Sequence, residues 1–215
     1  VCSSDLALRS LRMIAARPVS RHAMLGVGDP LLADHPRYES RKSSPAAEPL
    51  DQIAAVRGRG AWTPGLFRGD GLANLDAVKS LASLPDTKVE LEALKAAVGG
   101  DESRLLLQDK ATEGRFRART DLADYAILVF ATHGLVGGDL AGLSEPALVL
   151  TPPETATAED DGLLTASEIS TLSLNADWVV LSACNTASGG GDGEGLSGLA
   201  KAFFYAGSRA LFVSH

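Results

Sequence analysis

The feature that most constrains the fold is a continuous apolar run, "YAILVFA" at residues 125–131, together with a second such run, "WVVLSA" at 178–183. Neither run alternates apolar with polar residues. Uninterrupted runs of this kind are typical of strands that are buried on both faces, as in a parallel sheet covered by helices on each side. The two runs therefore predict an α/β fold.

Amphipathic segments surround these runs in a regular order. Residues 86–100 carry apolar positions at helical spacing and end in a Gly pair, and Thr165 with Glu168 three residues later forms a capping box. The alternation of strands and helices predicts a mostly parallel central sheet with helices on both faces. We expect strands at 22–27, 104–109, 125–134, 145–153, 176–184 and 208–215, and helices at 86–100, 111–124, 164–174 and 193–207.

One domain is expected over residues 20–215. Residues 1–19 are interpreted as an upstream linker or the end of a helix, with 1–6 interpreted as a sequencing or cloning scar. Residues 30–75 are rich in Pro, Gly and charge, which predicts a long irregular surface insertion. Because the chain ends inside the apolar run "ALFVSH", we expect the domain to be truncated at its C-terminus.

The bulk composition argues against several classes of protein. The net charge is −7, whereas nucleic-acid-binding domains usually carry a basic face, so nucleic acid is not expected as a partner. The longest apolar runs are far shorter than a membrane span. The two cysteines, Cys2 and Cys184, are too few for a disulfide framework or a cysteine-based zinc site. We expect a cytoplasmic protein that does not bind a membrane.

The glycine-rich segment after the second apolar run raises the question of a nucleotide site. Residues 193–198, "GEGLSG", match G-x-G-x-x-G and precede a predicted helix. The first Gly, however, lies well beyond the end of the strand, whereas the nucleotide fingerprint needs an immediate tight turn. Glu194 would repel a pyrophosphate, and no acidic residue follows Gly198 to bind a ribose. Nucleotide binding is therefore the weaker interpretation, and these glycines indicate a flexible loop.

A histidine and a cysteine follow the two apolar runs. His133 precedes Gly134, and Cys184 precedes the polar Asn185. Functional groups gather at the carboxyl ends of parallel strands, so His133 and Cys184 meet if their strands are neighbours. A thiol beside a histidine base can attack a carbonyl, and Gly134 leaves its N–H free to donate to an oxyanion. A cysteine in this position is otherwise a small buried side chain, and both interpretations stay open.

Several segments, in their order along the chain, resemble one family. They are similar to the CHAT domain, a caspase-like peptidase module that is often found beside tetratricopeptide repeats and is common in bacteria. The resemblance extends from about residue 22 to residue 215. It implies an α/β/α sandwich with a mostly parallel central sheet and a cysteine endopeptidase that needs no metal or other cofactor. The segments are "VFATHG", "EPALVL", "DGLLTASEI", "ADWVVLSACNTA" and "GEGLSGLAKAFFYAGSRALFVSH".

By position, the resemblance implies that His133 is the general base and acid and that Cys184 is the nucleophile of a His-Cys dyad. The backbone N–H groups of Gly134 and Cys184 would form the oxyanion hole. The implied partners are a protein or peptide substrate and an upstream tetratricopeptide repeat region or regulatory protein. The alternative is a catalytically inactive CHAT-type interaction module, and a nucleotide-binding α/β domain is less favoured.

Two acidic residues are candidates for a specificity pocket. Asp29 follows the first predicted strand, and Asp161 lies shortly before the predicted helix at 164–174. A carboxylate in the substrate groove would favour a basic residue before the cleaved bond. Aspartate in such places is also a common turn or capping residue, so each position has a structural interpretation as well.

Overall fold

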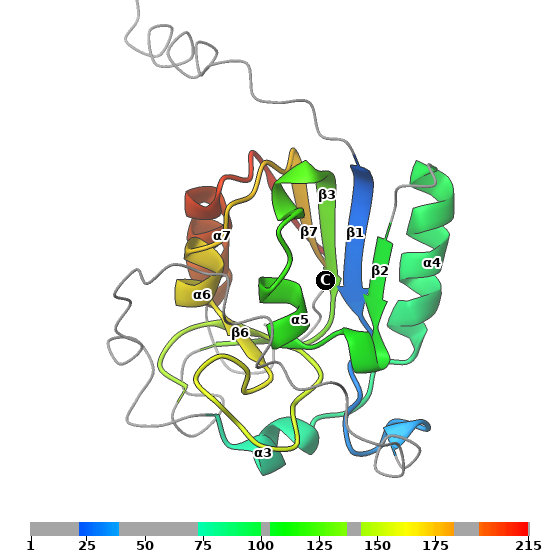
Figure 1. Cartoon of the computed structure of the whole chain (residues 1–215), viewed down its shortest axis with the longest axis vertical. Helices are drawn as coiled ribbons and strands as arrows, with labels where there is room; N and C mark the ends of the chain where they lie inside the picture. The colour runs from blue at the N-terminus through cyan, green and yellow to red at the C-terminus, as the bar shows by residue number, and fades with distance from the viewer. Residues whose placement is uncertain (1–21, 39–72, 100–103, 137–142, 183–193, 215) are drawn as a thin grey trace, which may run out of the picture.

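A five-stranded parallel sheet with helices on both faces forms the centre of the molecule (Figure 1). The computed structural model describes residues 22–38, 73–99, 104–136, 143–182 and 194–214. The strands lie in the order β2-β1-β3-β7-β8, and every neighbouring pair is parallel, which confirms the predicted α/β fold with a mostly parallel sheet. Their bounds are β1 His22–Gly28, β2 Arg104–Leu107, β3 Tyr125–Ala131, β7 Trp178–Ser182 and β8 Leu211–Ser214.

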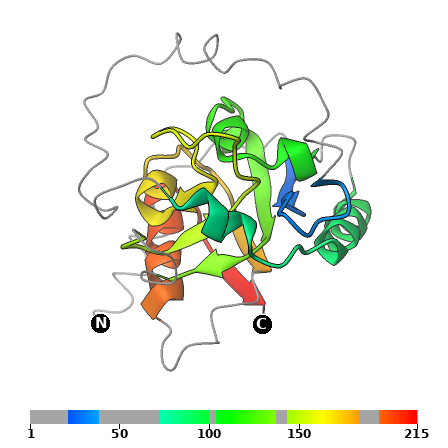
Figure 2. The ribbon, with the colours of Figure 1, turned by 90° about the horizontal axis from the view of Figure 1, so that it is seen from below.

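Helices lie on both sides of this sheet, as the view from below shows (Figure 2). On one face α4 packs with Leu91 fully buried near Met24 and Val129. The other face is covered by α5, α6 and α7. The helices have the bounds α3 Leu75–Lys79, α4 Asp86–Val98, α5 Glu113–Arg117, α6 Ala166–Ser170 and α7 Glu194–Ala206, and two 3₁₀ turns span Gln108–Lys110 and Leu122–Asp124.

Phe130 of β3 is the centre of the larger core. Its ring lies 5.4 Å from that of Phe116 in α5, in an edge-to-face contact, and 5.5 Å from that of Phe203 in α7. All three side chains are fully buried. One strand residue therefore joins two helices of the same layer, and aromatic contacts of this geometry add stabilisation beyond the area they bury.

A second sheet, antiparallel and three-stranded, was not expected from the sequence. It consists of β4 (Gly134–Leu135), β5 (Ala147–Val149) and β6 (Leu163–Thr165) in that order. The strand predicted at 125–134 therefore ends at Ala131, and Gly134 belongs to the second sheet. The strand predicted at 145–153 pairs with β4 and β6 rather than with the central sheet. Length explains the error, because two- and three-residue strands carry too little periodicity to be recognised.

The helix predicted at 111–124 is much shorter in the structure. It begins as expected, because the Thr112 hydroxyl accepts a hydrogen bond from the N–H of Arg115. It ends at Arg117. Arg119 forms an ion pair with Asp121 at 2.5 Å, and side chains two positions apart do not face each other on a helix. Local pairing in the turn thus competes with continuation of the helix.

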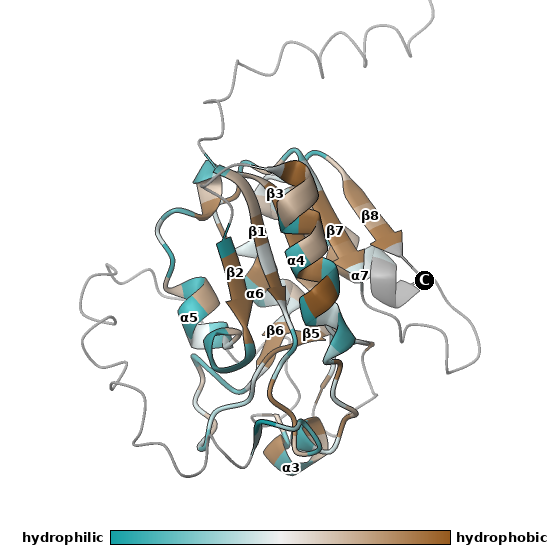
Figure 3. Cartoon of the chain, turned by 90° about the vertical axis from the view of Figure 1, so that its right-hand side faces the viewer, coloured by the Kyte–Doolittle hydropathy of each residue, from teal (hydrophilic) through white to brown (hydrophobic). Residues whose placement is uncertain are grey.

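Trp178 begins the apolar run at 178–183, which the sequence predicts to be buried on both faces, but 43% of Trp178 is exposed. Its ring stacks on that of Phe212 in β8 at 4.7 Å, and 53% of Phe212 is exposed. Both strands are hydrophobic over most of their length (Figure 3). The two rings are exposed because α4 packs mainly on β1, β2 and β3 rather than on β7 and β8.

The start of the predicted insertion at 30–75 packs into the molecule rather than over its surface. Leu31 is 3% exposed, and Leu32 is fully buried in a small core with Val78 of α3 and residues of the second sheet. Residues 39–72, which make up most of this insertion, and residues 1–19 lie outside the described part of the chain. Among the helices that the structure describes, none is long and apolar enough to cross a bilayer.

Candidate functional site

The carboxyl ends of β1, β3 and β7 meet at one edge of the central sheet. Gly28, the last residue of β1, lies opposite Ala131, the last residue of β3. Asp29 follows β1 directly, and His133 follows β3 by two residues. α3 and the segment 31–38 lie below this edge (Figure 1). Two of the sequence-predicted residues, His133 and Asp29, are therefore placed on the edge where parallel sheets usually carry their sites.

His133 is held in one tautomer by a backbone carbonyl. Its side chain is buried, and Nε2 lies 2.6 Å from the carbonyl oxygen of Ala82. A carbonyl can only accept, so Nε2 must carry the hydrogen and donate it. Nδ1 then has the lone pair of the neutral ring, and it is buried with no hydrogen-bond partner among the described residues. An oriented imidazole with a free basic nitrogen is what a general base requires.

Cys184 lies outside the described residues, as does the rest of the segment 183–193. The neighbouring strands nevertheless constrain the chain that leads to it. β3 and β7 are adjacent, and their partners, such as Phe130 and Leu181, are 51 positions apart. His133 and Cys184 have the same separation in the sequence. The condition that the sequence left open, that the two apolar strands are neighbours, is met.

Gly134 has a backbone N–H that its own sheet does not use. It lies opposite Leu148 of β5, and the N–H of Val149 donates to the carbonyl of His133 at 2.9 Å. This pattern makes Gly134 and Leu148 a non-hydrogen-bonded pair, whose N–H and C=O groups point away from the partner strand. The N–H of Gly134 therefore points to the open side of β4, next to His133.

Asp29 is almost fully buried and accepts hydrogen bonds on both oxygens. Nε2 of His35 donates to Oδ1 at 3.0 Å, and Nε2 of Gln108 donates to Oδ2 at 2.8 Å. The backbone N–H of Asp29 donates to the hydroxyl of Thr87 at 3.0 Å. These contacts tie the end of β1 to the segment 31–38. A place in a specificity pocket stays a prediction for Asp29.

Asp161 also has both oxygens in hydrogen bonds within the fold. Oδ1 accepts from the N–H of Leu163 at 3.1 Å, and Oδ2 accepts from the N–H of Ala73, just before α3, at 3.1 Å. Its own N–H donates to Oε2 of Glu113 at 3.0 Å. Asp161 thus joins β6 to the segment that carries Ala82. Its proposed place in a specificity pocket stays a prediction too.

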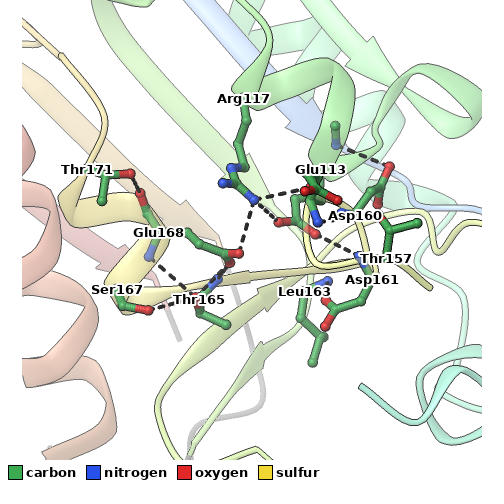
Figure 4. A network of polar contacts seen from close by, with 12 residues as sticks. Glu113, Arg117, Thr157, Asp160, Asp161, Leu163, Thr165, Ser167, Glu168 and Thr171 are labelled. Atoms are coloured by element: carbon green, nitrogen blue, oxygen red, sulfur yellow. Dashed lines mark hydrogen bonds and ion pairs between the residues drawn. The ribbon is translucent and has the colours of Figure 1, made fainter. Parts of the chain in front are cut away.

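A network of buried carboxylates is connected to Asp161 through Glu113 (Figure 4). Sequence reasoning did not find this network. NH1 of Arg117 donates to Oε1 of Glu113 at 2.7 Å and to Oε1 of Glu168 at 3.0 Å. Both glutamates are fully buried. The capping box of Thr165 and Glu168 is present as predicted, but only the fold brings Glu168 within reach of Arg117.

Burial raises the pKa of two carboxyl groups in this region, those of Glu113 and Asp160. Desolvation raises the pKa of Glu113 well above its ordinary value of 4.5, and the negative charge of Glu168 adds to the increase, while Arg117 opposes it. Desolvation likewise raises the pKa of Asp160, against the hydrogen bond that its carboxylate accepts from the N–H of Gly114. The guanidinium of Arg117 thus offsets the desolvation of Glu113 only in part.

The raised pKa of Glu113 makes stability depend on pH with a definite sign. Its folded state binds the proton more tightly than the unfolded state, so its contribution is fully present below pH 4.5 and is lost as the pH rises through the folded pKa. In Glu113→Gln this dependence is absent. We expect the unfolding free energy of the wild type, minus that of the variant, to fall by up to about 1.4 kcal/mol per pH unit between pH 4.5 and the raised pKa of the folded state. Urea denaturation at a series of pH values measures it, and a constant difference would contradict it.

The fold and the carboxyl edge described above define an α/β protein with a caspase-like arrangement of its parallel sheet. The chain belongs to the CHAT domain family, whose model matches residues 2–215. CHAT domains are related to the caspase-like peptidases. No curated protein and no solved structure was found to match the chain. In the described residues, no group of three or more His, Cys, Asp and Glu side chains could hold a metal ion.

Proposed function

We propose that this CHAT domain is a cysteine endopeptidase that cleaves a protein substrate through His133 and Cys184. The observation that carries the proposal is the state of His133. Its Nε2–H is bound to the carbonyl of Ala82, and its Nδ1 lone pair is unused among the described residues, at the carboxyl end of the strand beside β7. His133 follows the end of β3 by two residues, and Cys184 follows the end of the adjacent parallel strand β7 by two residues in the sequence.

The proposed reaction uses each of these groups in turn. Nδ1 of His133 takes the thiol proton, and the sulfur of Cys184 bonds to the carbon of the scissile carbonyl. The N–H groups of Gly134 and Cys184 donate to the oxyanion that forms. His133 then returns the proton to the leaving amine as the C–N bond breaks, which leaves a thioester on Cys184. Water, deprotonated by the same imidazole, hydrolyses the thioester and releases the acid.

The test is the rate at which iodoacetamide alkylates Cys184, measured against pH in a Cys2→Ser background so that a single thiol reports. An ordinary thiol has a pKa of ~8.5 and is only a few per cent ionised at pH 7. An imidazolium at the end of β3 stabilises the thiolate, so we expect alkylation at pH 7 to be about tenfold faster than in His133→Ala.

A matched control replaces a histidine at the opposite end of the sheet. His22 begins β1 and contacts the ring of Tyr125, remote from the carboxyl edge. We expect His22→Ala to leave the alkylation rate of Cys184 within twofold of the parent. Equal rates in the parent and in His133→Ala would reject the peptidase proposal. A fast, His133-dependent thiol that is not acylated by any peptide thioester or peptide electrophile would favour the interaction module.

A further inference from the structure

We propose that Asp34 is a positioning residue for His133 and acts on it through a single peptide group, the one that joins Ala82 to Ser83. The inference deepens the proposed function, because it connects the imidazole of His133 to a carboxylate through one intervening peptide group. The contacts that support it are independent of whether Cys184 is a nucleophile. Sequence reasoning had no means of finding Asp34, since the link to His133 consists of backbone atoms.

Both ends of this peptide group are hydrogen bonded. The N–H of Ser83 donates to Oδ1 of Asp34 at 2.8 Å. The C=O of Ala82, in the same peptide unit, accepts from Nε2 of His133 at 2.6 Å. A peptide unit is planar and conjugated, so a negative charge on its N–H side increases the electron density on its oxygen. The carboxylate therefore makes the carbonyl of Ala82 a stronger acceptor for His133.

The segment that carries Asp34 is fixed against the segment that carries Ala82. One residue before Asp34, the N–H of Ala33 donates to the carbonyl of Lys79, the last residue of α3, at 2.9 Å. Leu32 and Val78 are fully buried in the same small core. Two hydrogen bonds and a shared core therefore hold the two segments in register, so that Asp34 faces the peptide group rather than open solvent alone.

The residue after Asp34 is equally well held. Nδ1 of His35 accepts from the N–H of Arg37 at 3.0 Å, which requires the hydrogen to be on Nε2. That Nε2 donates to the buried carboxylate of Asp29 at 3.0 Å. His35 is thus fixed in its own tautomer by contacts that do not include Asp34. It provides an internal reporter for whether the segment keeps its structure when Asp34 is changed.

The experiment reads the tautomer of His133 directly. Long-range ¹H–¹⁵N correlation spectra of the whole chain, at pH 8 where an ordinary histidine is neutral, distinguish Nε2–H from Nδ1–H. The His133→Ala spectrum assigns the resonance. We expect Nε2–H to dominate in the wild type and its excess over Nδ1–H to fall about threefold in Asp34→Ala, because the peptide group of Ala82 and Ser83 then loses the hydrogen bond to a carboxylate that makes its carbonyl a stronger acceptor. Asp34→Asn, which keeps an acceptor oxygen, should retain more of the excess than Asp34→Ala.

The control and the outcomes separate the alternatives. Asp76→Asn, an exposed residue in the first turn of α3, should leave His133 unchanged. An unchanged His133 tautomer in Asp34→Ala would overturn the proposal, and so would a parallel change at His35, which would make Asp34 only an anchor of its segment. Asp34→Asn offers the same comparison if Asp34→Ala does not fold.

The failure of this inference can be told apart from the failure of the proposed function. If the His133 tautomer responds to Asp34 but Cys184 reacts equally with and without His133, the positioning role holds and the peptidase proposal fails. If Cys184 depends on His133 while Asp34→Ala moves neither the tautomer nor the alkylation rate, the peptidase proposal stands and Asp34 has no positioning role.

Discussion

Replacing Arg117 with Met should lower the unfolding free energy at pH 7 by about 3–5 kcal/mol, as is usual when one partner of a buried ion pair is removed. Glu113 and Glu168 have no exposed side-chain area, and NH1 of Arg117 bonds to both of them. Met fills a similar volume but leaves both carboxylates without their cation. Because the side chain of Arg117 is 23% exposed, we expect the lower end of this range. Urea denaturation followed by circular dichroism measures the change.

An exposed arginine supplies the matched control for this substitution. Arg209 pairs with Asp177 at 2.8 Å, and their side chains are 55% and 43% exposed. Surface pairs of this kind contribute about 0–1 kcal/mol, so Arg209→Met should have little effect. The cost of Arg117→Met should also shrink at acidic pH, where Glu113 takes up a proton. Equal costs for the two substitutions would show that the Glu113–Glu168 network is not desolvated.

Gly207→Ala should be the second severe substitution, with a loss of about 3 kcal/mol or more. Gly207 follows α7 and has φ +113°, which L side chains rarely adopt. A Cβ atom there would lie 2.5 Å from the carbonyl oxygen of Leu174, a backbone atom that cannot rotate away. That carbonyl belongs to the chain leaving α6, whose N–H at Leu174 is bonded to Ala206. The added methyl group would therefore force α6 and α7 apart.

Gly99→Ala separates the two causes of this loss. Gly99 ends α4 with φ +72°, and a Cβ atom there would meet nothing within 4 Å. Like Gly207 it has a positive φ, but it lacks the close contact. We expect Gly207→Ala to cost about 1–3 kcal/mol more than Gly99→Ala in thermal or urea unfolding. If the two costs are equal, the effect at Gly207 arises from its backbone conformation and not from the contact with Leu174.

Local sequence was sufficient for much of the fold. The long apolar run at 125–131 predicted β3, and the helical spacing in 86–100 predicted α4, which ends at the Gly pair as expected. The capping box of Thr165 and Glu168 is present as well. These features depend on residues that lie within a turn or two of one another. They are encoded in periodicity and in capping side chains, and they can be recognised without knowledge of the rest of the chain.

Contacts between distant segments were decided only in the tertiary structure. Trp178 lies in a predicted strand, but its exposure depends on which strands α4 covers. Arg117 lies in a predicted helix, but its partner Glu168 belongs to a helix 51 residues further along the chain. The orientation of His133 depends on the carbonyl of Ala82, a backbone atom that every residue type possesses.

The sequence by itself therefore determined the alternation of elements and the candidate pair of His133 and Cys184, because apolar runs and reactive side chains can be read one residue at a time. The tertiary structure decided that β3 and β7 are neighbours and that Asp34 accepts from the peptide group whose carbonyl binds His133. It also decided that Nδ1 of His133 is the nitrogen whose lone pair has no partner in the part of the chain that the structure describes. These facts depend on strand order and on backbone hydrogen bonds. Almost every residue type has the same backbone N–H and C=O groups, so the sequence does not indicate which of them will pair.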